Sequence, residues 1–256
     1  MHSHEESVHT QFDPRAQAYL GSAVHARGAD LECARAWVAA HLEGRGEALD
    51  VGCGAGHLSF ALAPQVAQVI ALDPSPNMLA TVAAAAAERG LANVATCSGT
   101  AEALPFENER FALVATRYSA HHWARLEAAL AEMYRVLAPG GRVLIIDVLG
   151  ADSALVDTHL QAMELLRDPS HVRDRAAYEW RALLAAQGFI DLSAASWPLR
   201  LDFAAWIERM QTPASSAAMI RSMQQRAPRE VRDALAFEAD GSFTCTTGAF
   251  WGRRGE

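Results

Sequence analysis

The chain has 256 residues, of which 51% are hydrophobic and 20% charged, so it can bury a large core without disulfide or metal staples. All 22 basic residues are arginines, and the absence of lysine excludes Schiff-base enzymes and P-loop nucleotide triphosphatases, which both need a lysine amine. The formal charge of −8 argues against nucleic acid and anionic membranes as partners.

The cysteines and the first ten residues set further limits. The four cysteines are widely spaced without a C-x-x-C pair, so we expect reduced thiols and no metal site. Residues 1–10 are polar and lack the apolar core of a signal peptide, and we interpret them as a frayed terminus. No run approaches the ~18 apolar residues of a membrane span. We therefore expect a soluble, cytoplasmic protein that is a monomer or a homodimer.

In chain order, the predicted elements begin with a helix or loop over residues 11–30 and an amphipathic helix over 31–42. Short apolar runs then alternate with helical stretches, which is typical of a parallel sheet covered by helices. Five strands are predicted there, over residues 48–51, 69–72, 94–97, 111–116 and 142–148.

Local signals predict where the intervening helices begin and end. Ser75 can cap a helix that has Pro76 at its first position, and Gly90 follows its last turn. Between the fourth and fifth strands, apolar residues recur at helical spacing from 126 to 137. The sequence Pro139-Gly140-Gly141 then predicts a turn.

The regular alternation weakens after residue 150. Residues 153–187 and 202–237 are predicted to be mostly helical, with a strand over 189–194 and a final strand over 243–251. The apolar residues from Trp197 to Met223 either cap a lipophilic ligand or pack a core of their own.

A glycine-rich loop follows the first predicted strand. The sequence from Asp50 to Gly56 contains Gly52, Gly54 and Gly56, where the backbone must turn sharply and a ligand can touch it. The following helix points its positive end into the loop. Asp73 ends the second strand 21 residues after Gly52, about where a carboxylate binds the ribose hydroxyls of an adenosine. Together these features predict a nucleoside-binding site.

The glycine spacing bears on which nucleoside cofactor binds. Dinucleotide folds use G-x-G-x-x-G, whereas this loop is G-x-G-x-G, with Asp50 two residues before Gly52. An acid at that point repels a pyrophosphate and attracts the ammonium of an amino acid. A nicotinamide-dependent oxidoreductase is therefore the weaker alternative.

Several blocks of the sequence resemble the class I S-adenosylmethionine-dependent methyltransferases, in the small-molecule branch that includes the ubiquinone and menaquinone C-methyltransferases. The resemblance runs from about residue 11 to 189 and rests on the glycine loop and on residues 71–79, 99–106 and 135–141. It implies S-adenosyl-L-methionine as cofactor. It also implies an α/β, Rossmann-like fold, with a seven-stranded, mostly parallel sheet, an antiparallel last strand and a helical cap. Ala112 departs from the family, where an aspartate is common, and we expect this to cost only a surface interaction.

The resemblance also implies the domain organisation and the cofactor contacts. Residues 1–256 form one domain, with N-terminal lid helices at 11–45, a cofactor-binding core at 46–150 and helical cap segments at 151–187 and 198–240. Asp73 is expected on the ribose, Met78 on the adenine, and Tyr19, with Ser22 and His25, in the lid. Arg117 is expected to meet the cofactor through its backbone or to pair with an acid such as Glu102. The expected cofactor-binding residues are Tyr19, Asp50, Gly52, Gly54, Gly56, Asp73, Pro74, Met78, Thr100, Ala101, Glu102 and Arg117.

The end of the fourth strand, residues 116–123, carries the side chains best suited to chemistry. It lies at the carboxyl edge of the sheet, where open α/β folds bind ligands. His121 or His122 is the candidate general base or acceptor-orienting group, because an imidazole pKa of ~6.5 suits proton removal. The alternative is that both histidines only stabilise their own loop. Tyr118 either lines the pocket or packs beneath it, and Asp147 is a weaker candidate base.

The predicted function is therefore methyl transfer from S-adenosyl-L-methionine to a small, apolar or aromatic molecule. The stretch after the fourth strand lacks the Asn/Asp-Pro-Pro-aromatic motif of nucleic-acid amino-methyltransferases, which argues against a base-methylating enzyme. A cofactor-binding module that has lost turnover is the non-enzymatic alternative.

Overall fold

The computed structural model describes residues 3–21, 26, 28–42 and 46–255. A seven-stranded sheet forms its centre, in the order β3-β2-β1-β4-β5-β7-β6. The strands are β1 (Glu47–Val51), β2 (Gln68–Asp73), β3 (Val94–Ser98), β4 (Phe111–Arg117), β5 (Leu137–Leu149), β6 (Phe189–Leu201) and β7 (Phe243–Arg254). Only β7 runs antiparallel to its neighbours, so the predicted sheet, with its antiparallel last strand, is confirmed.

Helices cover both faces of this sheet, which is why its strands are apolar on both sides. In β5, Val143 and Ile145 face one core, whereas Leu144 and Ile146 face the other. The first core is covered by α7 (Leu126–Val136) and α9 (Ala177–Ala186). The opposite face is covered by α4 (Ala29–Leu42), α5 (His57–Leu62) and α6 (Pro76–Glu88).

The local boundary signals hold for α6, while the turn before β5 differs from expectation. The Ser75 hydroxyl accepts a hydrogen bond from the backbone N–H of Met78 at 3.1 Å, and Gly90 has a φ of +68°. The turn predicted at 139–141 lies inside β5, where the pairing with β4 shifts register. Gly140, with a φ of +73°, lets the chain bulge without leaving the sheet.

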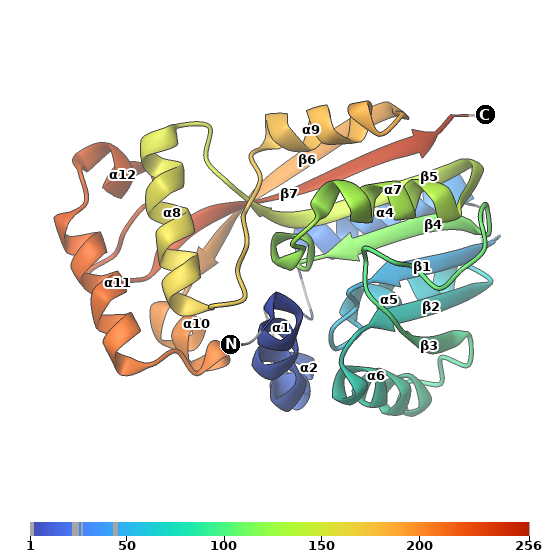
Figure 1. Cartoon of the computed structure of the whole chain (residues 1–256), viewed down its shortest axis with the longest axis horizontal. Coiled ribbons are helices and arrows are strands. Elements are labelled where there is room, and N and C mark those ends of the chain that lie inside the picture. The colour runs from blue at the N-terminus through green and yellow to red at the C-terminus, as the bar shows by residue number, and fades with distance from the viewer. Residues whose placement is uncertain (1–2, 22–25, 27, 43–45, 256) are drawn as a thin grey trace.

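The cap is built on the far ends of β6 and β7, which extend beyond the rest of the sheet (Figure 1). Its helices are α8 (Ala154–Arg167), α10 (Phe203–Met210), α11 (Ala214–Arg226) and α12 (Arg229–Ala234). Trp206 is buried against Phe243 and Met163 in a core that belongs to the cap itself. The apolar residues of this segment therefore mainly pack the cap. Met219 is an exception, because 54% of its surface is exposed.

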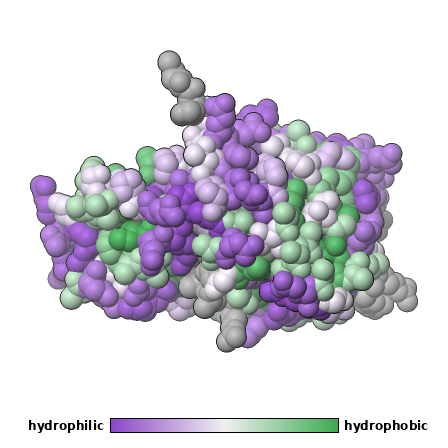
Figure 2. Space-filling model, turned by 90° about the horizontal axis from the view of Figure 1, so that it is seen from below, coloured by the Kyte–Doolittle hydropathy of each residue, from purple (hydrophilic) through white to green (hydrophobic). Residues whose placement is uncertain are grey.

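The N-terminal segment is helical, and its interpretation as a frayed terminus is wrong. Helix α1 (His4–Phe12) is followed by η1 (Asp13–Arg15) and α2 (Ala16–Leu20), all lying between the sheet and the cap (Figure 1). The Ser3 hydroxyl and the Glu6 carboxylate exchange hydrogen bonds with each other's backbone N–H, which caps α1. Polar side chains gather over the middle of the lower face, where these helices lie (Figure 2). No described helix is long and apolar enough to cross a membrane.

Candidate active site

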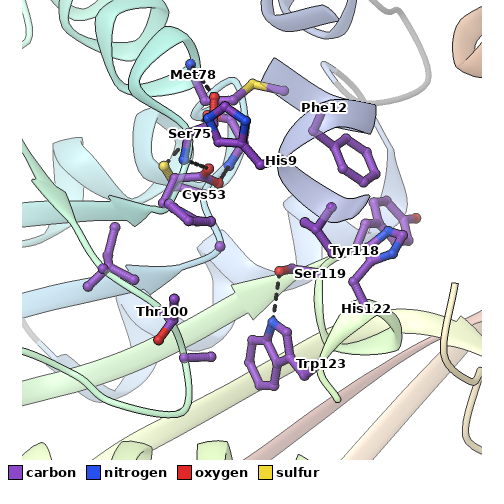
Figure 3. Close-up of a pocket in the computed structure, with 18 of the residues that line it drawn as sticks. His9, Phe12, Cys53, Ser75, Met78, Thr100, Tyr118, Ser119, His122 and Trp123 are labelled. Atoms are coloured by element: carbon purple, nitrogen blue, oxygen red, sulfur yellow. Dashed lines mark hydrogen bonds between the residues drawn. The ribbon is translucent and has the colours of Figure 1, made fainter. Parts of the chain in front are cut away.

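A cavity of about 310 Å³ lies at the carboxyl ends of β1, β2 and β4. It is lined by every predicted cofactor-binding residue except Gly56. We call it the cofactor cavity. Figure 3 shows Cys53, Ser75 and Met78 along one side of it, with Ser119, His122 and Trp123 across from them. The sheet topology thus brings together three segments that the sequence places far apart.

Each of the three glycine positions in the loop requires a glycine for a different structural reason. Gly54 has a φ of +50° and open space where a Cβ would stand, so its backbone faces the cavity. A Cβ on Gly52 would lie 1.9 Å from the Ser119 hydroxyl, so this glycine allows a close approach of the loop after β4. Gly56, with a φ of +85°, allows close packing against Phe60 and Val82, which explains why it does not line the cavity.

Asp73 connects the glycine loop to the turn that follows β2. Its carboxylate accepts hydrogen bonds from the backbone N–H groups of Gly54 and Ser75, both at 2.9 Å. Each oxygen accepts one bond and keeps a lone pair for a ligand. Burial raises the pKa of this carboxyl. The two backbone bonds fix the orientation of the carboxylate in the cavity wall.

Asp50 lies beneath the same loop with an unsatisfied oxygen. The Ser59 hydroxyl donates to Oδ2 at 2.6 Å, whereas Oδ1 is buried and has no hydrogen-bond partner among the described residues. Burial raises the pKa of Asp50 to about 6. A buried carboxylate without a counter-charge is costly unless a cation completes it. This site therefore fits the ammonium of an amino acid.

The opposite end of the cofactor cavity is apolar. Met78 is 2% exposed and packs against Ala55 and Ala16, while Thr100, Ala101 and Glu102 form a neighbouring wall. An aromatic base can stack on such a surface, so the predicted adenine position is compatible with this end.

Helix α1 contributes cavity residues that we did not predict from the sequence. They are His4, Glu5, Val8, His9 and Phe12. The ring Nε2 of His4 donates to the backbone carbonyl of His122 at 2.7 Å, which ties the helix to the loop after β4. The Ser3-x-x-Glu6 pattern is a helix-start signal that could have revealed this helix. Tyr19 does line the cavity, whereas Ser22 and His25 lie outside the described residues.

Arg117 pairs with Asp30 of α4, and the expected pairing with Glu102 is wrong. The Nε of Arg117 donates to Oδ2 of Asp30 at 2.5 Å, and both side chains are buried. The guanidinium also lies over the Tyr118 ring, 4.5 Å from its centroid. Asp30 is separated from Arg117 by 87 positions, so no local pattern links the two residues.

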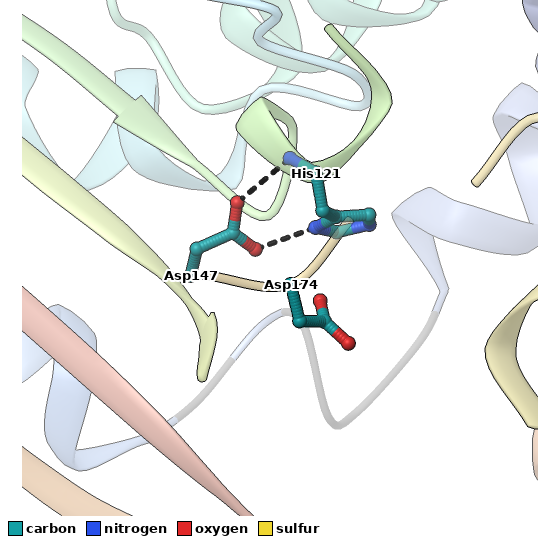
Figure 4. A group of neighbouring side chains, drawn as sticks. All are labelled: His121, Asp147 and Asp174. Atoms are coloured by element: carbon teal, nitrogen blue, oxygen red, sulfur yellow. Dashed lines mark hydrogen bonds and ion pairs between the residues drawn. The ribbon is translucent and has the colours of Figure 1, made fainter. Parts of the chain in front are cut away.

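The two histidines after β4 occupy different electrostatic environments. His121 Nδ1 donates to Asp147 Oδ1 at 2.6 Å, and the Asp147 carboxylate outweighs burial and raises the pKa of His121 to about 9 (Figure 4). His122 Nδ1 donates to the carbonyl of Ser170 at 3.1 Å. Burial, together with the charge of His121, lowers the pKa of His122 to about 4. At neutral pH His121 is therefore cationic, and His122 is neutral with a lone pair on Nε2.

Among the described residues, His121, Asp147 and Asp174 form the one group whose ligand atoms could surround a metal ion, all within 4.8 Å of one another (Figure 4). The short hydrogen bond between His121 and Asp147 already uses two of these atoms. The expectation that the protein has no resident metal stays a prediction.

The comparisons with known proteins agree with this geometry. Residues 49–145 match the model of the methyltransferase domain family. The YafE protein of Escherichia coli is 43% identical over 193 residues, which are 75% of this chain and 93% of that protein. The methyltransferase YcgJ of Bacillus subtilis is 34% identical over 88% of both chains. Its crystal structure has a TM-score of 0.82 over 89% of this chain and 98% of that one.

The chain belongs to the class I S-adenosylmethionine-dependent methyltransferases. A demethylmenaquinone methyltransferase of Lactococcus lactis is also similar, with 39% identity over 102 residues. That match covers 39% of this chain and 40% of that protein.

This methyltransferase has a second cavity of about 80 Å³, which we call the cap cavity. It shares Phe12, Tyr19, Tyr118 and His122 with the cofactor cavity and extends from there toward the cap. His122 thus faces both cavities, whereas His121 lines only the cap cavity. The sequence could not reveal the cap cavity, because its walls come from α1, β5, β6, α8 and α10.

Tyr118 lies at the junction of the two cavities. It has a φ of +53°, and its hydroxyl shares a hydrogen bond with Thr247 of β7 at 3.1 Å. Burial raises the pKa of this phenol above its usual range, so Tyr118 is neutral at physiological pH. The side chain therefore both lines the pocket and packs beneath it.

Proposed function

We propose that this methyltransferase binds S-adenosylmethionine in the cofactor cavity and methylates a small molecule that enters the cap cavity. Asp50 carries the cofactor assignment, because it lines the cavity and its buried Oδ1 has no partner in the described structure. The ammonium of the cofactor's methionine part supplies the missing positive charge. The carboxylate of Asp73 takes the ribose, and Met78 packs on the adenine.

Bound S-adenosylmethionine supplies an activated methyl group on a positively charged sulfur. The protein has to align the acceptor with this group and exclude water. The junction residues Phe12, Tyr19, Tyr118 and His122 enclose the only space common to both cavities described above, so the reacting atoms meet there.

We assign His122, and not His121, to the acceptor. His121 is already protonated at neutral pH, so it cannot accept a proton. His122 presents an unprotonated Nε2, because its Nδ1 proton is held by the Ser170 carbonyl. A base with a pKa of about 4 is weak, so His122 orients the acceptor by accepting its hydrogen bond and takes a proton only from an acidic acceptor.

An apolar or aromatic acceptor body is supported by the walls of the cap cavity, which include Val148, Leu199, Leu201 and Trp206. The similarity to a demethylmenaquinone methyltransferase is consistent with such an acceptor. The cytoplasmic location and the oligomeric state stay predictions.

Isothermal titration calorimetry with S-adenosylmethionine tests the cofactor assignment. Asp73→Ala should remove measurable binding, and Asp73→Asn should weaken it more than ~100-fold, because two hydrogen bonds to a charged group are worth about 3 kcal/mol or more. Asp233→Ala, which changes an exposed aspartate of α12, should bind like the wild type. A folded wild-type protein that ignores the cofactor would refute the proposal.

Turnover is tested by the release of S-adenosylhomocysteine in a panel of quinols, phenols and carboxylic acids. His122→Ala should reduce turnover more than it reduces cofactor affinity. Equal turnover in His122→Ala and the wild type would dismiss the role of this histidine but not the activity. Cofactor binding without turnover of any acceptor would favour the silent binding module, and a change in NADH fluorescence would favour an oxidoreductase.

A further inference from the structure

The wall of the cap cavity carries two arginines. Arg167 comes from α8 and Arg209 from α10. The other walls of the cap cavity combine apolar side chains (Val148, Leu199, Leu201 and Trp206) with polar ones (His121, Glu164, Asp168 and Asp174). An acceptor that fills the cap cavity, which rests on the function proposed above, therefore lies against these arginines.

Arg167 already has partners. Its Nε donates to the backbone carbonyl of Trp206 at 3.0 Å, and its Nη1 lies 3.4 Å from the Glu164 carboxylate. Its guanidinium also lies over the Trp206 ring, 4.9 Å from the centroid. Arg167 is thus part of the cavity wall.

Arg209 differs from Arg167 in having no such partner. Within the described part of the chain, no carboxylate lies within 4.0 Å of its guanidinium, and no hydrogen bond holds it. The side chain is partly buried, and burial together with the nearby Arg167 lowers its pKa. Guanidinium groups stay charged even so, which leaves a positive charge without a direct partner among the described residues on the cavity wall.

The acidic groups around the cap cavity have other roles. Asp168 accepts two hydrogen bonds from Ser170, at 2.6 and 2.8 Å, and Asp147 pairs with His121. Burial raises the pKa values of Glu164 and Asp174, which favours their neutral forms. None of these carboxyl groups neutralises Arg209 by direct contact.

We infer that Arg209 binds the carboxylate of the methyl acceptor, which is a small monocarboxylic acid with an apolar or aromatic body. The planar guanidinium matches a carboxylate with two parallel hydrogen bonds. A dianionic phosphate fits less well, because Arg209 offers a single charge and the wall also carries Asp168. The anchored carboxylate itself is not methylated.

Calorimetry with the full chain, saturated with S-adenosylhomocysteine, tests this inference. The probes are benzoate, phenylacetate and 3-phenylpropanoate, each compared with its primary amide, and phenyl phosphate. The variants are Arg209→Gln, which removes the charge, and Arg209→Lys, which keeps it. Arg226→Gln is the matched control, because Arg226 is an exposed arginine of the neighbouring helix α11. S-adenosylmethionine affinity is measured for every variant.

We expect at least one carboxylate to bind the wild type at least tenfold more tightly than its amide. Arg209→Gln should abolish that preference, Arg209→Lys should keep part of it, and Arg226→Gln should keep all of it. Equal binding of carboxylate and amide, equal carboxylate affinity in Arg209→Gln and the wild type, tighter binding of phenyl phosphate, or no carboxylate binding at all would each overturn the inference. Arg209 does not line the cofactor cavity, so S-adenosylmethionine affinity should be unchanged throughout. A wild-type protein that does not bind S-adenosylmethionine would count against the proposed function instead.

Discussion

Replacement of Asp50 by asparagine separates the binding role of this side chain from its effect on stability. The change keeps the shape of the side chain and removes its charge. Burial raises the pKa of Asp50 from 3.8 to about 6. A shift of about two units, at ~1.4 kcal/mol each, means that ionised Asp50 destabilises the cofactor-free protein by roughly 3 kcal/mol at neutral pH.

The asparagine amide occupies the site of the unpartnered Oδ1 and itself lacks an acceptor there, which costs about 1–3 kcal/mol. The cofactor-free variant should therefore be as stable as the wild type at pH 8, or more stable by up to ~2 kcal/mol. That corresponds to an increase in Tm of at most about 4–8 °C for a chain of this size.

The sign of the pH dependence follows from the raised pKa. The contribution of Asp50 to stability is fully present below pH 3.8 and is lost as the pH rises through about 6. Any advantage of Asp50→Asn should therefore be largest above pH 7 and should disappear near pH 4. Thermal melts of both proteins without cofactor, from pH 4 to 8, measure it.

Cofactor affinity should change in the opposite direction. Removing one partner of a buried charge pair costs about 2–5 kcal/mol, so Asp50→Asn should bind S-adenosylmethionine at least ~30-fold more weakly. Asp233→Asn, at an exposed position of α12, should change neither Tm nor affinity. Unchanged affinity in Asp50→Asn would show that the charge does not bind the cofactor. A Tm lowered by more than about 5 °C at pH 8 would show that the charge stabilises the fold.

Three other predictions concern the same site. The affinity of the wild type for S-adenosylmethionine should fall as the pH drops below about 6, because Asp50 becomes neutral, and calorimetry of Asp50→Asn should show no such fall. The ring protons of His121 should titrate near pH 9 in NMR spectra, and Asp147→Asn should lower that pKa. An unshifted His121 pKa in the variant would contradict the assignment. The pair stabilises the protein below pH 6.5, and this stabilisation is lost as the pH rises through 9. Gly52→Ala should destabilise the protein by more than ~2 kcal/mol, because of its φ of +68° and the close contact with Ser119. Gly54→Ala should cost only about 1 kcal/mol in stability but should still weaken cofactor binding. Denaturant unfolding measures the stability of both variants, and calorimetry measures their cofactor affinity.

The alternation of strands and helices and the placement of the cofactor cavity follow from patterns that are short in sequence. The glycine loop and Asp73 each come directly after a strand, and parallel neighbours β1 and β2 bring both strand ends to the same edge. The cap on α6 depends on Ser75 and on contacts within three residues. Such features can be predicted, because the residues that define them are close together along the chain.

The remaining features depend on contacts between distant segments. Asp30 and Arg117 meet across 87 positions, and helix α1 reaches the loop after β4 through His4 and His122, 118 positions apart. The two adjacent histidines differ in charge because of Asp147 and of burial, so the local sequence does not indicate the difference.

The sequence by itself therefore determined the alternation of strands and helices, the glycine loop and the acidic residues beneath and beside it, because apolar periodicity and turn chemistry act locally. Only the tertiary structure decided which histidine lines the cofactor cavity, what Arg117 pairs with and where the cap cavity lies. Each of these depends on desolvation and on charges from elements far apart in the chain. For the same reason the uncompensated charge of Arg209 became visible only once the cap had been placed against the sheet.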